Sequence, residues 1–183
     1  MLAVENLRQS FGSLIVLEEL SFSIRSGEFI SIVGPSGCGK TVLLRLIAGL
    51  LRPSSGKLLV EDEKHHAPRI AYAFQKSPLF PWLSLIENVR ICMSGNPLSG
   101  DEREKQIFAY FKAAGLSGFE HELPWRISGG MRQKVNVIRA FCSGWPLILM
   151  DEPFVSLDFP SRQELQQLTL KLWEQEKKTI LFV

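Results

Sequence analysis

The sequence predicts an α/β fold in which helices pack on a mostly parallel sheet, with a helical segment inserted in the middle of the chain. Three observations support this prediction. Short apolar runs typical of strands alternate with segments whose apolar residues recur at helical spacing. A glycine-rich segment, GPSGCGKT at residues 34–41, lies between one such strand and one such helix. From about residue 84 to residue 119, apolar residues recur mainly at helical spacing.

The first third of the chain contains strand and turn signals, followed by one helix. Apolar runs bounded by turn residues predict strands at residues 2–4, 20–24, 29–33, 57–60 and 70–74. A turn is expected at residues 25–28, which include Gly27. A helix is expected over residues 41–50, because Gly49 and Pro53 would end it there.

The last third returns to alternating strands and helices. Residues 147–150 form a compact apolar run that predicts a buried strand. The segment 163–174 is amphipathic, and its leucines at positions 165, 168 and 172 share one helical face. A final strand is expected at residues 179–183.

Composition is that of an ordinary globular protein and excludes several classes. The 183 residues are 45% hydrophobic and 22% charged, and the net charge of +2 gives no indication of nucleic acid binding. The three cysteines form no CxxC pair, which favours a reducing, cytosolic compartment. No apolar run approaches the ~18 residues of a membrane helix, and the start lacks a signal peptide. If the chain works at a membrane, a partner would have to hold it there.

The glycine-rich segment matches the phosphate-loop pattern G-x-x-x-x-G-K-[ST] in its required context of a strand before and a helix after. Glycines let backbone N–H groups surround an anion, and the following helix presents its positive end. Lys40 can reach the β- and γ-phosphates, and the Thr41 hydroxyl can bind Mg²⁺. A chance match in a glycine turn is the alternative. The expected nucleotide-binding residues here are Gly34, Ser36, Gly37, Cys38, Gly39, Lys40, Thr41 and Val42.

A second motif, PLILMDEPFVSLD at residues 146–158, places two carboxylates at the end of an apolar strand. Asp151 would help to hold Mg²⁺, and Glu152 would polarise the attacking water as general base. Alone, two adjacent acids would favour a solvated strand end. Together with the phosphate loop they predict a P-loop NTPase, but they do not choose among kinases, GTPases, helicases and transporters.

A third motif is ISGGMRQK at residues 127–134, in which Ser128 would cap a helix. Gly129 and Gly130 leave the amino end of that helix open to a phosphate, or they form a hinge before a core helix. The stretch lies shortly before the acidic strand, and this order of motifs resembles the ATP-binding cassette (ABC) family. SGGMRQ is similar to the signature motif of that family. The resemblance implies that this motif closes over ATP held by a second subunit, in a head-to-tail pair.

Other residues match the family pattern. Gln75, at the end of a strand in YAFQKSPLFPW, resembles the family glutamine that senses Mg²⁺ and the attacking water and communicates with a membrane partner. Ser156-Leu157-Asp158 resembles the loop that crosses the dimer interface. Phe11 stands where the family has an aromatic residue that stacks on adenine, although it could instead be a core residue.

The resemblance covers the whole chain and implies one ABC ATPase domain over residues 1–183. Its P-loop core would comprise residues 1–75 and 143–183, and a helical subdomain with the signature motif would comprise residues 76–142. The end, KKTILFV, resembles the last family strand, and the threonine-histidine pair that follows it in the family is absent. We therefore expect a C-terminal truncation, with the chain a fragment of a longer reading frame rather than a protein that ends here.

The segment LFPWLSLIENV, with Pro81-Trp82, is similar to the ATPases of nitrate, sulfonate and taurine importers. Lys134, Asn136 and Val155 depart from that pattern. The resemblance implies an ATP- and Mg²⁺-dependent motor subunit that drives uptake of a small solute. Its partners would be a second ATPase subunit, a membrane permease and, indirectly, a solute-binding protein, with no nucleic acid. It would sit on the cytoplasmic face of the cell membrane. The alternatives are a cassette that binds ATP without hydrolysing it and a soluble ABC ATPase outside transport.

Overall fold

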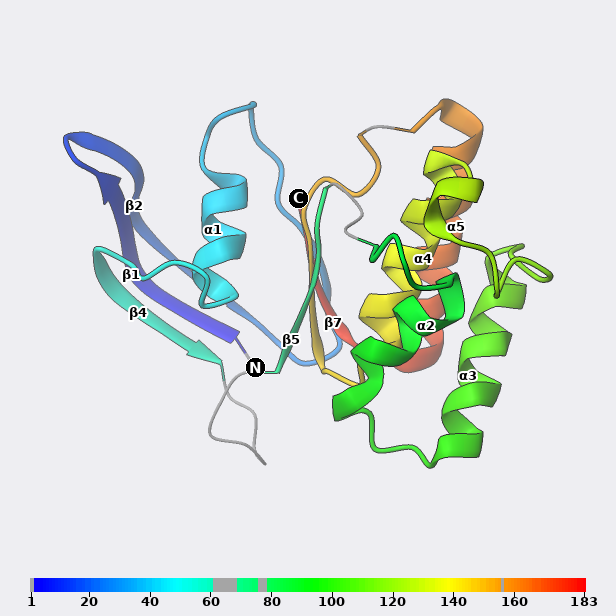
Figure 1. The fold of residues 1–183 in the computed structure, drawn as a ribbon. Coiled ribbons are helices and arrows are strands. Elements are labelled where there is room, and N and C mark those ends of the chain that lie inside the picture. Colours follow the sequence, from blue (N-terminus) through cyan, green and yellow to red (C-terminus); the bar gives the residue numbers. More distant parts are fainter. Residues whose placement is uncertain (1, 61–68, 76–78, 156) are drawn as a thin grey trace.

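The computed structural model describes residues 2–60, 69–75, 79–155 and 157–183 (Figure 1). The strands are β1 (Leu2–Phe11), β2 (Leu14–Ile24), β3 (Phe29–Ser31), β4 (Ser55–Val60), β5 (Ile70–Ala73), β6 (Leu147–Met150) and β7 (Thr179–Phe182). The helices are α1 (Lys40–Ile47), α2 (Leu85–Arg90), α3 (Gly100–Ala113), α4 (Gly129–Cys142) and α5 (Phe159–Glu176), with short 3-10 turns at Ile91–Gly95 and Pro124–Arg126.

The predicted parallel sheet is present, in the order β3-β7-β6-β5. All four residues of β6 are buried, as a central parallel strand requires. Successive residues of this strand face opposite sides of the sheet. Leu147 and Leu149 pack with α1, whereas Ile148 and Met150 pack with α4 and α5.

A second, antiparallel sheet in the order β2-β1-β4 was not predicted from the sequence. Its central strand, β1, has 10 residues, whereas the sequence predicted a strand only at residues 2–4. The register shifts between Val4 and Leu7, and Asn6 there has a left-handed φ of 46°. This irregularity interrupts the alternation of apolar and polar residues that would have revealed the full strand.

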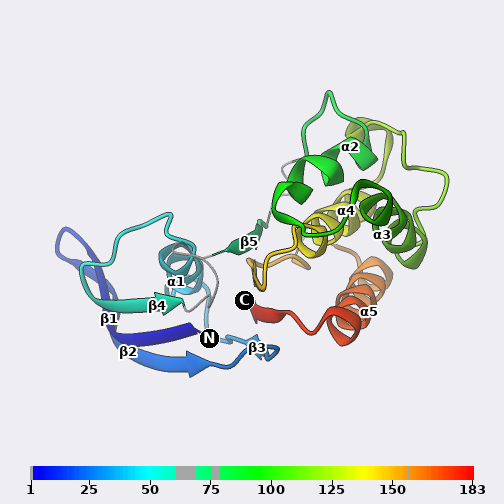
Figure 2. The same ribbon diagram turned by 90° about the horizontal axis from the view of Figure 1, so that it is seen from below.

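Helix α1 lies between the two sheets, and the other four helices lie on the far side of the parallel sheet (Figures 1 and 2). The apolar face of α1 is Leu43, Leu44, Leu46 and Ile47. It packs against Leu2, Val4 and Leu7 of β1 and against Leu181 of β7. This packing fixes the amino end of α1 at the edge of the molecule where the parallel strands end.

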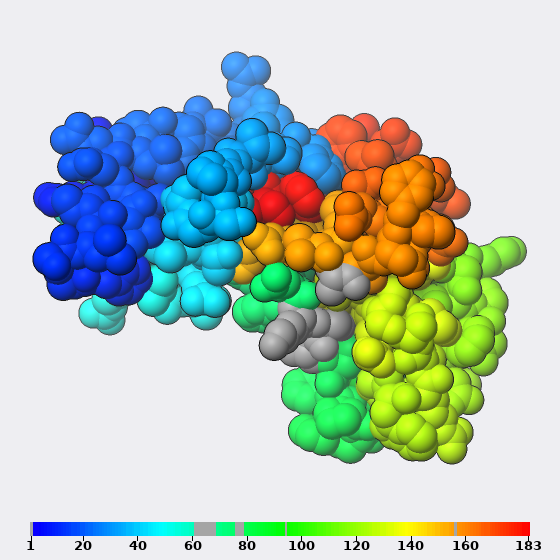
Figure 3. Space-filling model, turned by 90° about the horizontal axis from the view of Figure 1, so that it is seen from above, coloured from blue at the N-terminus to red at the C-terminus, as the bar shows by residue number. Residues whose placement is uncertain are grey.

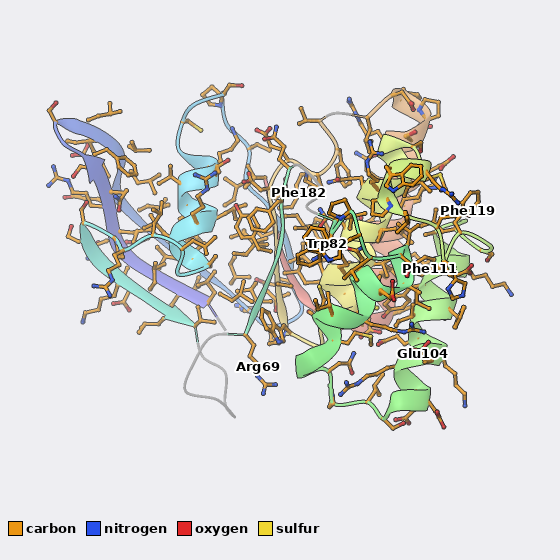
Figure 4. The ribbon with its side chains drawn as sticks, in the orientation of Figure 1. Arg69, Trp82, Glu104, Phe111, Phe119 and Phe182 are labelled. Carbon is orange, nitrogen blue, oxygen red and sulfur yellow. The ribbon has the colours of Figure 1, made fainter. Side chains whose placement is uncertain are left out.

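The predicted helical character of the middle of the chain is confirmed. Ser84 and Ser99 begin α2 and α3 with capping boxes to Glu87 and Glu102. Phe111 of α3 is fully buried within the helical layer, as Figure 4 shows. The division into a core and a 76–142 subdomain remains a prediction. Among the described helices, none combines the length and apolar character needed to cross a membrane.

The predicted amphipathic helix at residues 163–174 is also present, as the longer α5. Its buried residues include Leu165, Leu168 and Leu172, the face expected from the sequence. Pro160 near its start and the Asp158 cap fix where the helix begins.

Candidate functional site

The phosphate loop connects β3 to α1 at the upper edge of the molecule in Figure 1. Gly37 and Gly39 have left-handed φ angles of 81° and 93°. A Cβ atom at Gly39 would lie 2.8 Å from Cγ1 of Val16, so β2 packs directly behind the loop. Only glycine satisfies both the backbone angle and this close approach. Gly39 therefore fixes the turn by which the loop enters α1.

Lys40, the first residue of α1, folds back over this loop. Its Nζ atom donates hydrogen bonds of 2.9 Å to the carbonyl oxygens of Gly34 and Pro35. The Cys38 thiol is exposed, and its Sγ lies 3.9 Å from the same ammonium. The loop thus gathers a cation and a helix amino terminus at one point, as an anion site requires.

Thr41 and Asp151 are brought together from opposite ends of the chain. The Thr41 hydroxyl donates to Oδ1 of Asp151 over 2.8 Å, and Asp151 is only 6% exposed. The Asp151 backbone N–H donates to the carbonyl of Ala73 over 3.0 Å, which ties the end of β6 to β5. Two of the three candidate metal residues, Thr41 and Asp151, are therefore in direct contact.

The donor set fits Mg²⁺. A hydroxyl and a carboxylate are hard oxygen ligands, and Mg²⁺ in nucleotide sites usually takes one or two protein ligands beside phosphates and water. Within the described residues, no cluster of three or more His, Cys, Asp or Glu side chains is placed to hold a metal. Thr41 and Asp151 could therefore hold Mg²⁺ beside the phosphates of a nucleotide and water.

Glu152 and Gln75 also lie in contact. Nε2 of Gln75 donates to Oε2 of Glu152 over 3.0 Å. Glu152 has a left-handed φ of 46°, which is uncommon for a residue other than glycine. Its N–H donates to the carbonyl of Val183 over 3.0 Å, so the residue that follows β7 supports this conformation. The carboxylate of the candidate general base is thus in contact with the glutamine.

The expected cap of α4 is present. Oγ of Ser128 accepts a 3.2 Å hydrogen bond from the N–H of Met131. A Cβ at Gly130 would lie 3.2 Å from Oγ of Ser161, whereas one at Gly129 would meet only Arg132, at 3.8 Å. Gly130 therefore serves the close packing of α4 on α5, and Gly129 leaves an open surface.

The amino ends of α1 and α4 face the same edge of the molecule but lie apart on it. Figure 1 shows the two helices on opposite sides of the parallel sheet. Figure 3 views that edge from above, with the light-blue phosphate-loop segment and the yellow-green start of α4 separated by other segments. The sequence correctly placed a helix amino end at Ser128-Gly129-Gly130, and the structure does not bring it to the phosphate loop of the same chain.

Two further site candidates have identifiable local surroundings. Asp158 is the N-cap of α5 and accepts a 2.8 Å hydrogen bond from the N–H of Ser161, which lowers the pKa of its carboxyl group. Phe11 is 49% exposed at the end of β1, in the hairpin whose second strand packs behind Gly39. Ser156, in the expected interface loop, lies outside the described residues.

Sequence reasoning missed two residues of this region. The Tyr72 hydroxyl donates to Oδ2 of Asp151 over 2.8 Å, and burial, followed by this hydrogen bond, raises the pKa of Tyr72. Asn136, which is 3% exposed, donates from Nδ2 to the carbonyl of Phe74 over 3.1 Å, directly before Gln75. The available signals were a hydroxyl on an otherwise apolar strand and a polar residue on the buried face of a helix.

This arrangement defines a P-loop nucleotide-binding protein: the phosphate loop follows β3, and the two carboxylates follow β6 of the same parallel sheet. Within that class, the chain belongs to the ABC transporter family, whose model matches residues 17–155. It is therefore an ABC ATPase cassette, and such cassettes bind ATP or ADP.

Similar proteins include several whose names state an import function. An uncharacterized ABC transporter ATP-binding protein of Methanocaldococcus jannaschii is 39% identical over 100% of this chain and 70% of its own length. A taurine import ATP-binding protein of Yersinia pestis is 37% identical over 100% of this chain and 72% of its own length. An aliphatic sulfonates import ATP-binding protein of Bacillus cereus is 38% identical over 94% of this chain and 68% of its own length.

Solved structures agree with the fold. A dimeric ATP-binding cassette in a post-hydrolysis state, bound to ADP and phosphate, has a TM-score of 0.81 and 32% identity, covering 100% of this chain and 87% of that one. A dimeric bacterial ABC transporter cassette has a TM-score of 0.82 and 31% identity, with coverage of 100% and 88%.

Proposed function

We propose that this chain is the motor subunit of an importer and works as a head-to-tail pair that encloses two ATP molecules. The observation that carries the proposal is the separation of its two anion-binding ends. The start of α4 shares one face with the phosphate loop but does not reach it (Figures 1 and 3). A second copy, turned by a two-fold axis, would supply its own Ser128-Gly129-Gly130 to this loop.

Each residue has a defined task in this pair. Lys40 and the loop backbone from Gly34 to Val42 bind the phosphates, and Phe11 stacks on the adenine. Thr41, Asp151 and Gln75 would hold Mg²⁺, which would offset the phosphate charge when bound. Glu152 polarises the attacking water, and its hydrogen bond to Gln75 holds its carboxylate in place. Asp158 meets the partner copy at the interface.

The segment after Gln75 faces the membrane permease in this proposal. Trp82 is 72% exposed on the helical side of the molecule (Figure 4). Asn136 joins the signature helix to the strand end that leads into Gln75. A change at the nucleotide would thereby move both the signature helix and the permease contact. The names of two relatives support a small solute such as taurine or an aliphatic sulfonate. In this proposal a solute-binding protein delivers the solute, and the pair works on the cytoplasmic face of the membrane.

Glu152→Gln tests the pair directly. The substitution removes the general base but retains an amide that can contact Gln75, so ATP should bind and persist. Sedimentation velocity should show a dimer with Mg²⁺ and ATP, and a monomer with ADP. The double variant Lys40→Ala/Glu152→Gln, which lacks the phosphate-binding cation, is the matched control and should remain monomeric with ATP. A Glu152→Gln protein that binds ATP and stays monomeric would contradict the proposal.

A further inference from the structure

Tyr72 occupies an unusual position next to the catalytic carboxylates. It lies on β5, in register with Leu149 of β6, two residues before the Asp151 that follows that strand. Its hydroxyl reaches across to Oδ2 of Asp151 over 2.8 Å, from a residue 79 positions away in the chain. Neither the phosphate-loop pattern nor the acidic motif includes this tyrosine.

The two oxygens of Asp151 are held by different partners. Oδ1 accepts from Thr41 and Oδ2 accepts from Tyr72, both over 2.8 Å. Thr41 is itself a candidate metal ligand: a lone pair of its oxygen would face the metal, and its O–H would still donate to Oδ1 of Asp151. The hydrogen bond from Tyr72 reaches the opposite oxygen of the carboxylate and is independent of that contact.

The carboxylate needs this second partner because its own rotamer does not fix its direction. The terminal torsion of an aspartate is broad, and hydrogen bonds decide where its oxygens point. A hydrogen bond from a neutral hydroxyl to a carboxylate is among the stronger ones in proteins. We propose, resting on the metal site of the proposed function, that Tyr72 is a positioning residue that holds Oδ2 of Asp151 so that Oδ1 stays directed at Thr41.

The tyrosine is itself held from two sides. Its ring packs against Phe74, with ring centroids 4.4 Å apart and an interplanar angle of 34°. The positive charge of Arg45, four residues after Thr41 on α1, acts on the Tyr72 hydroxyl and opposes the rise of its pKa. The same helix therefore carries Thr41, which bonds Asp151, and Arg45, which interacts with Tyr72. Such a rigid support is what an outer partner of a metal ligand requires.

Tyr72→Phe tests the assignment, because it removes one hydroxyl and retains the ring. The readout is the affinity for a non-hydrolysable ATP analogue, measured by calorimetry with Mg²⁺ and again with EDTA. The ratio of the two affinities reports the metal site and is independent of turnover. We expect Tyr72→Phe to reduce this ratio by about 10-fold, the lower range for loss of an outer partner of a metal ligand. Its affinity in EDTA should match that of the unchanged protein.

The chain offers a matched control, since it contains two tyrosines. Tyr110 of α3 also donates its hydroxyl to a carboxylate, that of Glu176 at the end of α5. Tyr110→Phe should leave the ratio unchanged. If the ratio of affinities in Tyr72→Phe equals that of the unchanged protein, or if affinity falls equally with Mg²⁺ and with EDTA, the role of Tyr72 is overturned while the metal site stands. An unchanged protein that gains no affinity from Mg²⁺ would instead overturn the metal site, and the role of Tyr72 with it.

Discussion

The variant Gly129→Ala should weaken the ATP-dependent dimer without reducing the folding stability of the chain. Gly129 is the first residue of α4 and is exposed, and an added Cβ would meet only Arg132, at 3.8 Å, an ordinary van der Waals distance. Alanine relieves the helix cost of glycine by at most about 1 kcal/mol. For a chain of this size the melting temperature should therefore stay the same or rise by up to about 4 °C.

The same methyl group should weaken the ATP-dependent pair. It would stand on the surface that approaches the phosphates of the partner copy and lengthen the backbone hydrogen bonds there. A hydrogen bond to a charged group contributes about 1.5 kcal/mol at the low end. A symmetric pair contains two such sites, so the loss is about 3 kcal/mol, or more than about 100-fold in the dimer dissociation constant.

The assay is sedimentation of Gly129→Ala in the Glu152→Gln background over a range of protein concentrations with Mg²⁺ and ATP, beside thermal unfolding without nucleotide. Gly100→Ala is the matched control, because Gly100 is also the first residue of a helix after a serine cap and has open space around its Cβ position. It should leave dimerisation unchanged. If Gly129→Ala dimerises as well as the parent protein, the contact between the signature helix and the ATP of the partner copy is refuted. If its melting temperature falls, the conclusion that the surface at Gly129 is open is refuted.

Two further predictions follow from the contacts around the site. Asn136→Ala removes the 3.1 Å hydrogen bond to the carbonyl of Phe74 and leaves that carbonyl without this donor, which should lower the free energy of unfolding by about 1–3 kcal/mol. Urea unfolding measures this free energy. A change within a few tenths of a kcal/mol would contradict a stabilising role for this hydrogen bond. Cys38 is exposed, whereas Cys142 is fully buried and burial raises the pKa of the Cys142 thiol. A maleimide should therefore modify Cys38 much faster than Cys142 and abolish ATP binding. Bound ATP should protect Cys38 from the reagent. Modification of Cys38 that leaves ATP affinity intact would contradict the position of this thiol in the phosphate site.

Local patterns predicted the parts of the site that depend on neighbouring residues. The phosphate loop, the buried strand before Asp151 and the Ser128 cap each follow from a few adjacent positions, and each is present. The antiparallel sheet was missed because the irregularity at Asn6 breaks the alternation along β1.

The contacts that assemble the site could not be read from the chain in the same way. Thr41 and Asp151 are 110 residues apart, and Gln75 and Glu152 are 77 residues apart. The sequence motifs indicate that such residues act together, but the distances depend on which strands are neighbours. Tyr72 could be found only from the pairing of β5 with β6, since one hydroxyl on an apolar strand has no pattern of its own.

The central claim is that the phosphate loop of one copy works with the signature helix of another. Mixing Lys40→Ala protein with Gly129→Ala protein tests it most directly, because each mixed pair contains one site with both an intact loop and an intact signature. The readout is retention of radiolabelled ATP on a protein dimer, with both variants also carrying Glu152→Gln. We predict that neither variant retains ATP on a dimer alone and that the mixture does. A mixture that retains no more than its separate components would contradict the shared site.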